Sequence, residues 1–109
     1  MIEIINNYIN GKLIISKSKE YIDIFEPATG DIYARVPNSK KSEIDEAIYS
    51  AKKAFLNWSN IPIEQRSNYL LMISKELQKS IMEFANYESR DTGKPISLSL
   101  KLDLSLIHI

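Results

Sequence analysis

Glu43, Asp45 and Glu46 form the densest group of side chains in this sequence that could perform acid–base chemistry. They follow a run of Ser and Lys residues and stand at the start of an apolar pattern with helical spacing. Carboxylates in the first turn of a helix ordinarily stabilise its positive end. We therefore interpret the three residues as helix-capping groups and not as a catalytic cluster.

Lys94, in the segment "TGKP", is the second candidate, because a Gly-Lys pair is part of the phosphate-binding loop of many nucleotidases. That loop needs a glycine five positions before the Gly-Lys pair and a Ser or Thr directly after it. Glu88 and Pro95 occupy these two positions. The sequence therefore predicts no phosphate loop, and it also lacks the Gly-x-Gly-x-x-Gly pattern of dinucleotide-binding folds.

Cysteine and histidine chemistry is almost absent from the sequence. There is no cysteine, which excludes disulfides, thiolate metal sites and a cysteine nucleophile within these 109 residues. His108 is the single histidine and cannot form a histidine-based metal cluster. The residue types alone therefore give no complete active site.

Composition fits one small globular domain or part of one, with 44% hydrophobic and 26% charged residues. Lys and Arg total 14, as do Asp and Glu, so no positive field favours a nucleic-acid partner. The longest apolar runs, such as residues 69–73, fall far short of the roughly 20 residues of a membrane span. No basic segment precedes an apolar one at the N-terminus. We expect a cytoplasmic protein with no membrane partner.

Two β-hairpins are predicted in the first 37 residues. Asn10-Gly11 lies between apolar stretches and tolerates the positive φ angles of a type I′ turn. Strands at about 21–25 and 32–36 flank a second turn, in which Pro27 presets φ and Gly30 closes a bulged loop.

A first helix is predicted at roughly 42–57, where apolar residues recur every three or four positions. Ser39 or Ser42 is the candidate N-cap. Phe55 and Trp58 continue the apolar stripe, so we interpret them as core residues and not as a ligand platform.

Two more helices are predicted after Pro62, which suits the first turn of the second helix. The third helix should start at Ser80, because Ser80 and Glu83 match a capping box, and should stop before Gly93. The buried face of the second helix is predicted to comprise Leu70, Ile73 and Leu77.

The chain alone is thus an α+β segment, with two N-terminal β-hairpins followed by three helices. The last stretch, residues 96–109, alternates apolar and polar residues as a strand does. It follows no turn and has no evident pairing partner, so we do not accept it as native structure.

Six segments in a fixed order carry a resemblance to a known family: "YINGK", "FEPATGD", "VP", "IDEAIYSAKKAFLNWS", "QRSNYLLMISKEL" and "YESRDTGKPI". Each is common alone, but the order and spacing together resemble the N-terminal segment of the aldehyde dehydrogenase superfamily, over residues 8 to about 103. The resemblance is greatest to members that act on betaine aldehyde and other small semialdehydes.

The resemblance implies an α/β parent fold with a Rossmann-type nucleotide-binding domain, of which residues 1–103 are the N-terminal part. It implies oxidation of a small-molecule aldehyde to a carboxylic acid with NAD or NADP, by a parent enzyme that is a homo-oligomer. In the family a cysteine thiolate adds to the carbonyl, a hydride passes to the nicotinamide, and a glutamate-activated water hydrolyses the thioester. No catalytic or cofactor-binding residue of that set matches a position here, so the chain alone is expected to be inactive.

One family site can be transferred to this sequence. In some members a monovalent cation is held by strand carbonyls before the Pro-Ala turn and by the Asp of "DTGKP", which here are Ile24, Phe25 and Asp91. Such oxygen ligands suit a potassium or sodium ion, and the three residues are expected to converge. The alternative is that Asp91 only ends a helix or bonds the loop around Gly93.

Residues 104–109 depart from the family pattern, and we expect them to be a non-native tail of a truncated gene product. The main alternative is a self-standing α+β protein-interaction module. A regulatory fragment that docks on full-length subunits is a third possibility that the sequence does not distinguish.

Overall fold

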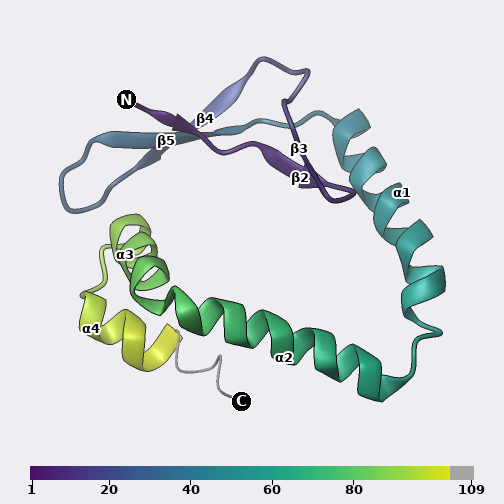
Figure 1. The fold of residues 1–109 in the computed structure, drawn as a ribbon. Coiled ribbons are helices and arrows are strands. Elements are labelled where there is room, and N and C mark those ends of the chain that lie inside the picture. Colours follow the sequence, from purple (N-terminus) through teal and green to yellow (C-terminus); the bar gives the residue numbers. More distant parts are fainter. Residues whose placement is uncertain (104–109) are drawn as a thin grey trace. The chain divides into compact units, whose positions relative to one another are not determined.

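The computed structural model describes residues 1–103, whose helices and strands are drawn in Figure 1. The chain forms two compact units. Unit 1 comprises residues 1–25 and 32–61 and contains the strands and the first helix. Unit 2 comprises residues 26–31, the tip of the second hairpin, together with residues 62–103.

The first predicted hairpin is confirmed. Strand β2 (Asn7–Ile9) pairs antiparallel with β3 (Lys12–Ile14). Asn10 and Gly11 have φ angles of 52° and 75°, the two positive values that a type I′ turn needs.

The second hairpin is also confirmed, and it belongs to a three-stranded sheet. Strand β4 (Tyr21–Phe25) pairs antiparallel with β5 (Ile32–Pro37), with an irregular register between Ile24 and Phe25. A short strand, β1 (Glu3–Ile4), pairs parallel with β5 and makes the order β1-β5-β4. The sequence prediction missed β1, because two residues are too few for an alternating pattern.

Helix α1 (Lys41–Trp58) confirms the first helix, but both predicted N-cap residues are wrong. Lys40 holds the N-cap position. The Ser39 hydroxyl instead accepts a hydrogen bond from Asn7 Nδ2 at 2.7 Å. This bond uses the Ser39 side chain to join α1 to β2.

Glu43 is a cap, as predicted, and also ties three segments of unit 1 together. Its carboxylate accepts hydrogen bonds from Ser16 Oγ at 2.9 Å, from the Lys17 N–H at 3.0 Å and from the Lys40 N–H at 3.2 Å. The side chain is only 7% exposed. Asp45, by contrast, makes an exposed ion pair with Lys41 at 2.6 Å.

Helices α2 (Ile63–Lys79) and α3 (Ile81–Thr92) of unit 2 are confirmed, but the Ser80–Glu83 capping box is wrong. Ser80 is the single residue between the two helices, and its side chain makes no cap bond. Its N–H already donates to the end of α2, and Glu83 accepts a bond from the Tyr87 hydroxyl at 3.0 Å instead. The start of α3 is therefore fixed by the end of α2.

The segment after Gly93 is helical, so its strand-like alternation was misleading. Gly93 ends α3 with a left-handed φ of 78°, as predicted. The Pro95 carbonyl then accepts bonds from the N–H groups of Leu98 and Ser99, which begin α4 (Ile96–Leu98) and a π-helical turn, η1 (Ser99–Asp103). The predicted tail, 104–109, lies outside the described residues.

Apolar burial is small in both units. Over residues 1–103, the buried hydrophobic residues are Ala34 in unit 1 and Ala85 in unit 2. Phe55 and Trp58 are 62% and 38% exposed, so the described residues supply little of the core that these side chains were predicted to face. Helix α2 contains no buried residue. Within the described part of the chain, no helix is long and apolar enough to cross a membrane.

Substituting Gly93 tests the turn that ends α3. An added Cβ would lie 3.3 Å from Pro27 Cβ, in a conformation that L-residues rarely adopt. We expect Gly93→Ala to destabilise unit 2 by about 1–2 kcal/mol. Gly30→Ala is the matched control, since Gly30 has a similar φ of 76° but a Cβ added there would meet nothing within 4 Å. The urea midpoint, followed by circular dichroism, should fall further for Gly93→Ala, and equal midpoints would contradict the contact.

Substituting Glu43 tests the hydrogen bonds by which its carboxylate links three segments of unit 1. The Lys17 N–H and then the Ser16 hydroxyl lower the pKa of the Glu43 carboxyl below its ordinary 4.5, against the opposing effect of burial. A carboxyl group whose pKa is lower in the folded state stabilises the protein at any pH above its unfolded-state pKa. This stabilisation is lost as the pH falls through the folded-state pKa. Glu43→Gln should therefore weaken amide-exchange protection of Lys17 and Lys40 severalfold at pH 7, with the difference vanishing well below pH 4.5. A difference that is independent of pH would show that the charge is unimportant.

Candidate functional site

Two of the three predicted cation ligands lie in unit 1. Ile24 and Phe25 are the last residues of β4, where the register between β4 and β5 becomes irregular. Ile24 is half-buried, and Phe25 is exposed. An irregularity at a strand end commonly redirects backbone groups, which is compatible with the use of their carbonyls as ligands.

The third predicted ligand, Asp91, lies in unit 2, in the last turn of α3. Its neighbours make the bonds that close this turn. Ser89 Oγ donates to the Lys94 carbonyl at 2.6 Å, and the Lys94 N–H donates to Thr92 Oγ1 at 3.3 Å. Thr92 thus supplies a polar partner for the loop around Gly93.

Unit 2 also brings the 26–31 turn to the C-terminal end of α3. Arg90 Nε donates to Glu26 Oε2 at 3.3 Å. Gly93 lies close to Pro27, as the short distance from the site of an added Cβ to the proline ring shows. These contacts involve the sequence neighbours of Phe25 and Asp91 and lie entirely within unit 2.

No cluster of three or more His, Cys, Asp or Glu side chains suited to a metal occurs among residues 1–103. The predicted alkali-ion site does not require one, because it uses two backbone carbonyls and a single carboxylate. The convergence of Ile24, Phe25 and Asp91 stays a prediction.

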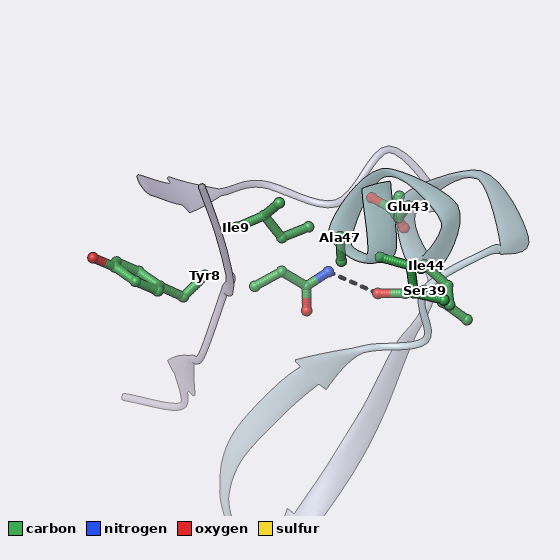
Figure 2. Close-up of a pocket in the computed structure, with 8 residues that line it drawn as sticks. Tyr8, Ile9, Ser39, Glu43, Ile44 and Ala47 are labelled. Carbon is green, nitrogen blue, oxygen red and sulfur yellow. Dashed lines mark hydrogen bonds between the residues drawn. The ribbon is translucent and has the colours of Figure 1, made fainter. Parts of the chain in front are cut away.

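A shallow hollow of about 280 Å³ lies in unit 1, between β2 and the first turns of α1 (Figure 2). Its polar groups are already engaged: Asn7 bonds Ser39, and Glu43 accepts its three bonds. Because its pKa is lowered, Glu43 is ionised at neutral pH and cannot serve as a general acid. We interpret this polar set as structural. The apolar part of the lining consists of Ile9, Ile44, Ala47 and Ile48 with Tyr8.

Sequence reasoning missed the partners of these groups. Ser16 and Glu43 are 27 residues apart, and Asn7 and Ser39 are 32 residues apart. The only available signal was the polar loop "SKSKE" before β4, which offers hydroxyl and N–H donors but does not say what accepts them.

Comparison with known proteins identifies the family of the chain. The family described as the aldehyde dehydrogenase family matches residues 14–107. Human 2-aminomuconic semialdehyde dehydrogenase is 41% identical over 100 residues, which cover 92% of this chain and 20% of the relative. Malonate-semialdehyde dehydrogenase 1 of Geobacillus kaustophilus is 34% identical over 91 residues, or 84% of this chain and 19% of the relative. The chain thus spans about a fifth of the length of these relatives.

Solved structures agree with the sequence match. An aldehyde dehydrogenase from Bartonella henselae superposes with a TM-score of 0.91 at 25% identity, covering 96% of this chain and 22% of that one. A protein described as a methylmalonate-semialdehyde dehydrogenase from Sinorhizobium meliloti 1021, solved with NAD, gives 0.84 at 28% identity, covering 89% and 20%. The resemblance seen in the six sequence segments is confirmed, and the chain belongs to the aldehyde dehydrogenase family.

Proposed function

We propose that this chain is the N-terminal part of an NAD(P)-dependent aldehyde dehydrogenase, with residues 1–103 in its nucleotide-binding domain. The observation that carries the proposal is the match of residues 14–107 to the family, with 41% identity to a relative about five times longer. The reaction is the oxidation of an aldehyde to a carboxylic acid by an oxidoreductase.

The substrate class we propose is a small semialdehyde. The similar relatives are named for 2-aminomuconic and malonate semialdehydes, which supports a substrate with a second acidic or polar group. NAD is favoured over NADP as the cofactor, because several structural neighbours were solved with NAD. A cytoplasmic location and a homo-oligomeric parent enzyme complete the proposal.

The residues of this chain support the reaction and do not perform it. The NAD nicotinamide, when bound, accepts the hydride that leaves the substrate carbon. The nucleophile must come from outside these 109 residues, because they contain no cysteine. The hydrogen bonds to Glu43 and the turn at Gly93 stabilise the local structure of the segment. The rest of the enzyme supplies the reacting groups.

A monovalent-cation site formed by the carbonyls of Ile24 and Phe25 and the carboxylate of Asp91 is part of the proposal. The family match over residues 14–107, which include all three positions, supports it. Hard neutral and anionic oxygens are the ligands that an alkali ion prefers.

A chimera tests the proposed function. The matched 100 residues of human 2-aminomuconic semialdehyde dehydrogenase would be replaced by residues 1–103 of this chain. Because the segment contributes no reacting group, we expect NADH formation within about tenfold of the parent enzyme, a barrier change below roughly 1.4 kcal/mol. The 109-residue chain alone and the parent lacking its matched segment are the controls, and both should produce no NADH. A folded, soluble chimera without activity would refute the proposal.

The cation site is tested in the same chimera by thermal unfolding. Potassium should raise the melting temperature relative to tetramethylammonium at equal ionic strength, since a ligand of the folded state stabilises it by about 2.7 kcal/mol at a hundred times its Kd. Asp91→Ala should abolish the difference between the two salts. Asp45→Ala, which removes a surface carboxylate paired with Lys41, should preserve it. Potassium stabilisation that survives Asp91→Ala would exclude Asp91 from the site.

A further inference from the structure

Asn10 is the one asparagine in the sequence that a glycine follows. The side-chain amide carbon of an asparagine can be attacked by the backbone nitrogen of the next residue, and a side chain on that residue hinders the attack. Gly11 has no Cβ, so it leaves the approach open. The Asn10-Gly11 pair thus joins an electrophilic amide to an unhindered backbone nucleophile.

Both residues are exposed at the turn between β2 and β3. Water can therefore reach the side-chain amide of Asn10. Other asparagine side chains are held by hydrogen bonds, since Nδ2 of Asn7 donates to Ser39 Oγ at 2.7 Å and Nδ2 of Asn86 donates to the carbonyl of Met82 at 2.9 Å. Asn7 is thus a restrained counterpart of Asn10 within the same hairpin.

The hairpin that contains the pair is small. Strands β2 and β3 have three residues each and form a two-stranded sheet of their own. A two-stranded hairpin is marginally stable in water, and elements of this kind open locally at low cost. When the turn opens, the backbone of Asn10 can rotate until the Gly11 nitrogen faces the side-chain carbon. The reactive conformation therefore does not require unit 1 to unfold.

We infer that Asn10 is a site of spontaneous deamidation, whose isoaspartate product releases the β2–β3 hairpin from α1. The inference concerns the chemical ageing of the chain and does not depend on the reaction of the parent enzyme.

The reaction has two steps and consumes only water. The Gly11 nitrogen gives its proton to a base in the solvent and bonds to Cγ of Asn10, while Nδ2 takes up a proton and leaves as ammonia. Water then opens the five-membered succinimide. Cleavage between the Gly11 nitrogen and Cγ gives aspartate, and cleavage between that nitrogen and the backbone carbonyl carbon of residue 10 gives isoaspartate. Nothing is oxidised or reduced, so no cofactor is required.

Isoaspartate changes the hairpin more than aspartate does. Its main chain runs through Cβ and Cγ of residue 10 and so contains one additional carbon. Ile9 pairs with Lys12 across a two-residue turn, which the longer main chain does not fit. Strand β2 is joined to the chain just before α1 by the bond from Asn7 to Ser39, and residues of the turn and of α1 line one hollow. Loss of the turn should therefore loosen β2 from α1.

Incubation of the 109-residue chain at neutral pH and body temperature tests the reaction. Trypsin cleaves after Lys12 and at no earlier position, so a single peptide carries Asn6, Asn7 and Asn10. Tandem mass spectrometry then assigns each conversion to its residue, and chromatography separates the aspartate and isoaspartate forms. We expect Asn10 to be converted at least about tenfold faster than Asn6 or Asn7, because only Asn10 precedes a residue without a Cβ. Conversion of Asn10 at the rate of Asn7 would overturn the inference.

Gly11→Ala is the control for the route of attack. A Cβ at this position would meet nothing within 4 Å, but a φ of 75° is strained for alanine. The strain should open the hairpin more often, which would speed the reaction if opening alone determined its rate. We expect conversion of Asn10 to slow about tenfold or more in Gly11→Ala, because the added methyl group hinders the nitrogen. An equal or faster conversion would exclude attack by the residue 11 nitrogen.

Amide exchange tests the release of the hairpin. Freshly prepared Asn10→Asp supplies the aspartate form and should keep the exchange protection of β2 and β3, because Asp-Gly also suits a type I′ turn. The isoaspartate fraction of the aged chain should lose this protection severalfold. Peptides from α2, which lies in unit 2, should exchange alike in all samples. Equal protection of β2 and β3 in the isoaspartate fraction and the fresh chain would refute the release.

Discussion

The Glu43 carboxylate is the polar group on which the arrangement of unit 1 depends. It is nearly inaccessible and accepts bonds from a side chain and two backbone amides in two segments that flank the second hairpin. Hydrogen bonds to an ionised acceptor are stronger than neutral ones, and a buried carboxylate without partners would be costly. Ala34 is the buried hydrophobic residue described in this unit, so apolar burial contributes little to it. Polar bonds such as those to Glu43 therefore contribute an unusually large part of what holds its segments in place.

Unit 2 depends on a different constraint, which is the close approach of a hairpin tip to a helix end. Gly93 permits this approach because it has no Cβ and adopts a left-handed conformation next to Pro27. The Glu26–Arg90 pair lies beside it. The segment "DTGKP" therefore has a structural explanation that does not involve phosphate, consistent with the failure of the phosphate-loop pattern.

Elements determined by neighbouring residues could be predicted from the sequence, and elements determined by distant partners could not. Asn10-Gly11 specified its turn, and Gly93 specified the end of α3, because both act through their own backbone angles. The N-cap of α1 was misassigned because Asn7 engages Ser39 from another element. Strand β1 was missed because its only signal is its pairing with β5.

At the candidate site, too, local sequence motifs could be interpreted and contacts between distant residues could not. The family and the residues proposed for the cation came from the order of short motifs, which is a property of the linear sequence. The anchoring of Glu43 by Ser16 and Lys17 was beyond reach, since any of several donors could have served. The helical segment after Pro95 was obscured by an alternation of apolar and polar residues that tertiary packing overrode.

The apolar run from Tyr69 to Ile73 has a consequence for the life of the protein in a cell. Five consecutive residues without a charge or a proline, rich in aliphatic and aromatic groups, are typical of segments that start aggregation when left uncovered. Lys75 and Glu76 follow the run closely and act as charged gatekeepers at one end. Chaperones and proteases recognise such a segment while it is uncovered, so substitutions that keep α2 exposed should lower the steady-state amount of the protein.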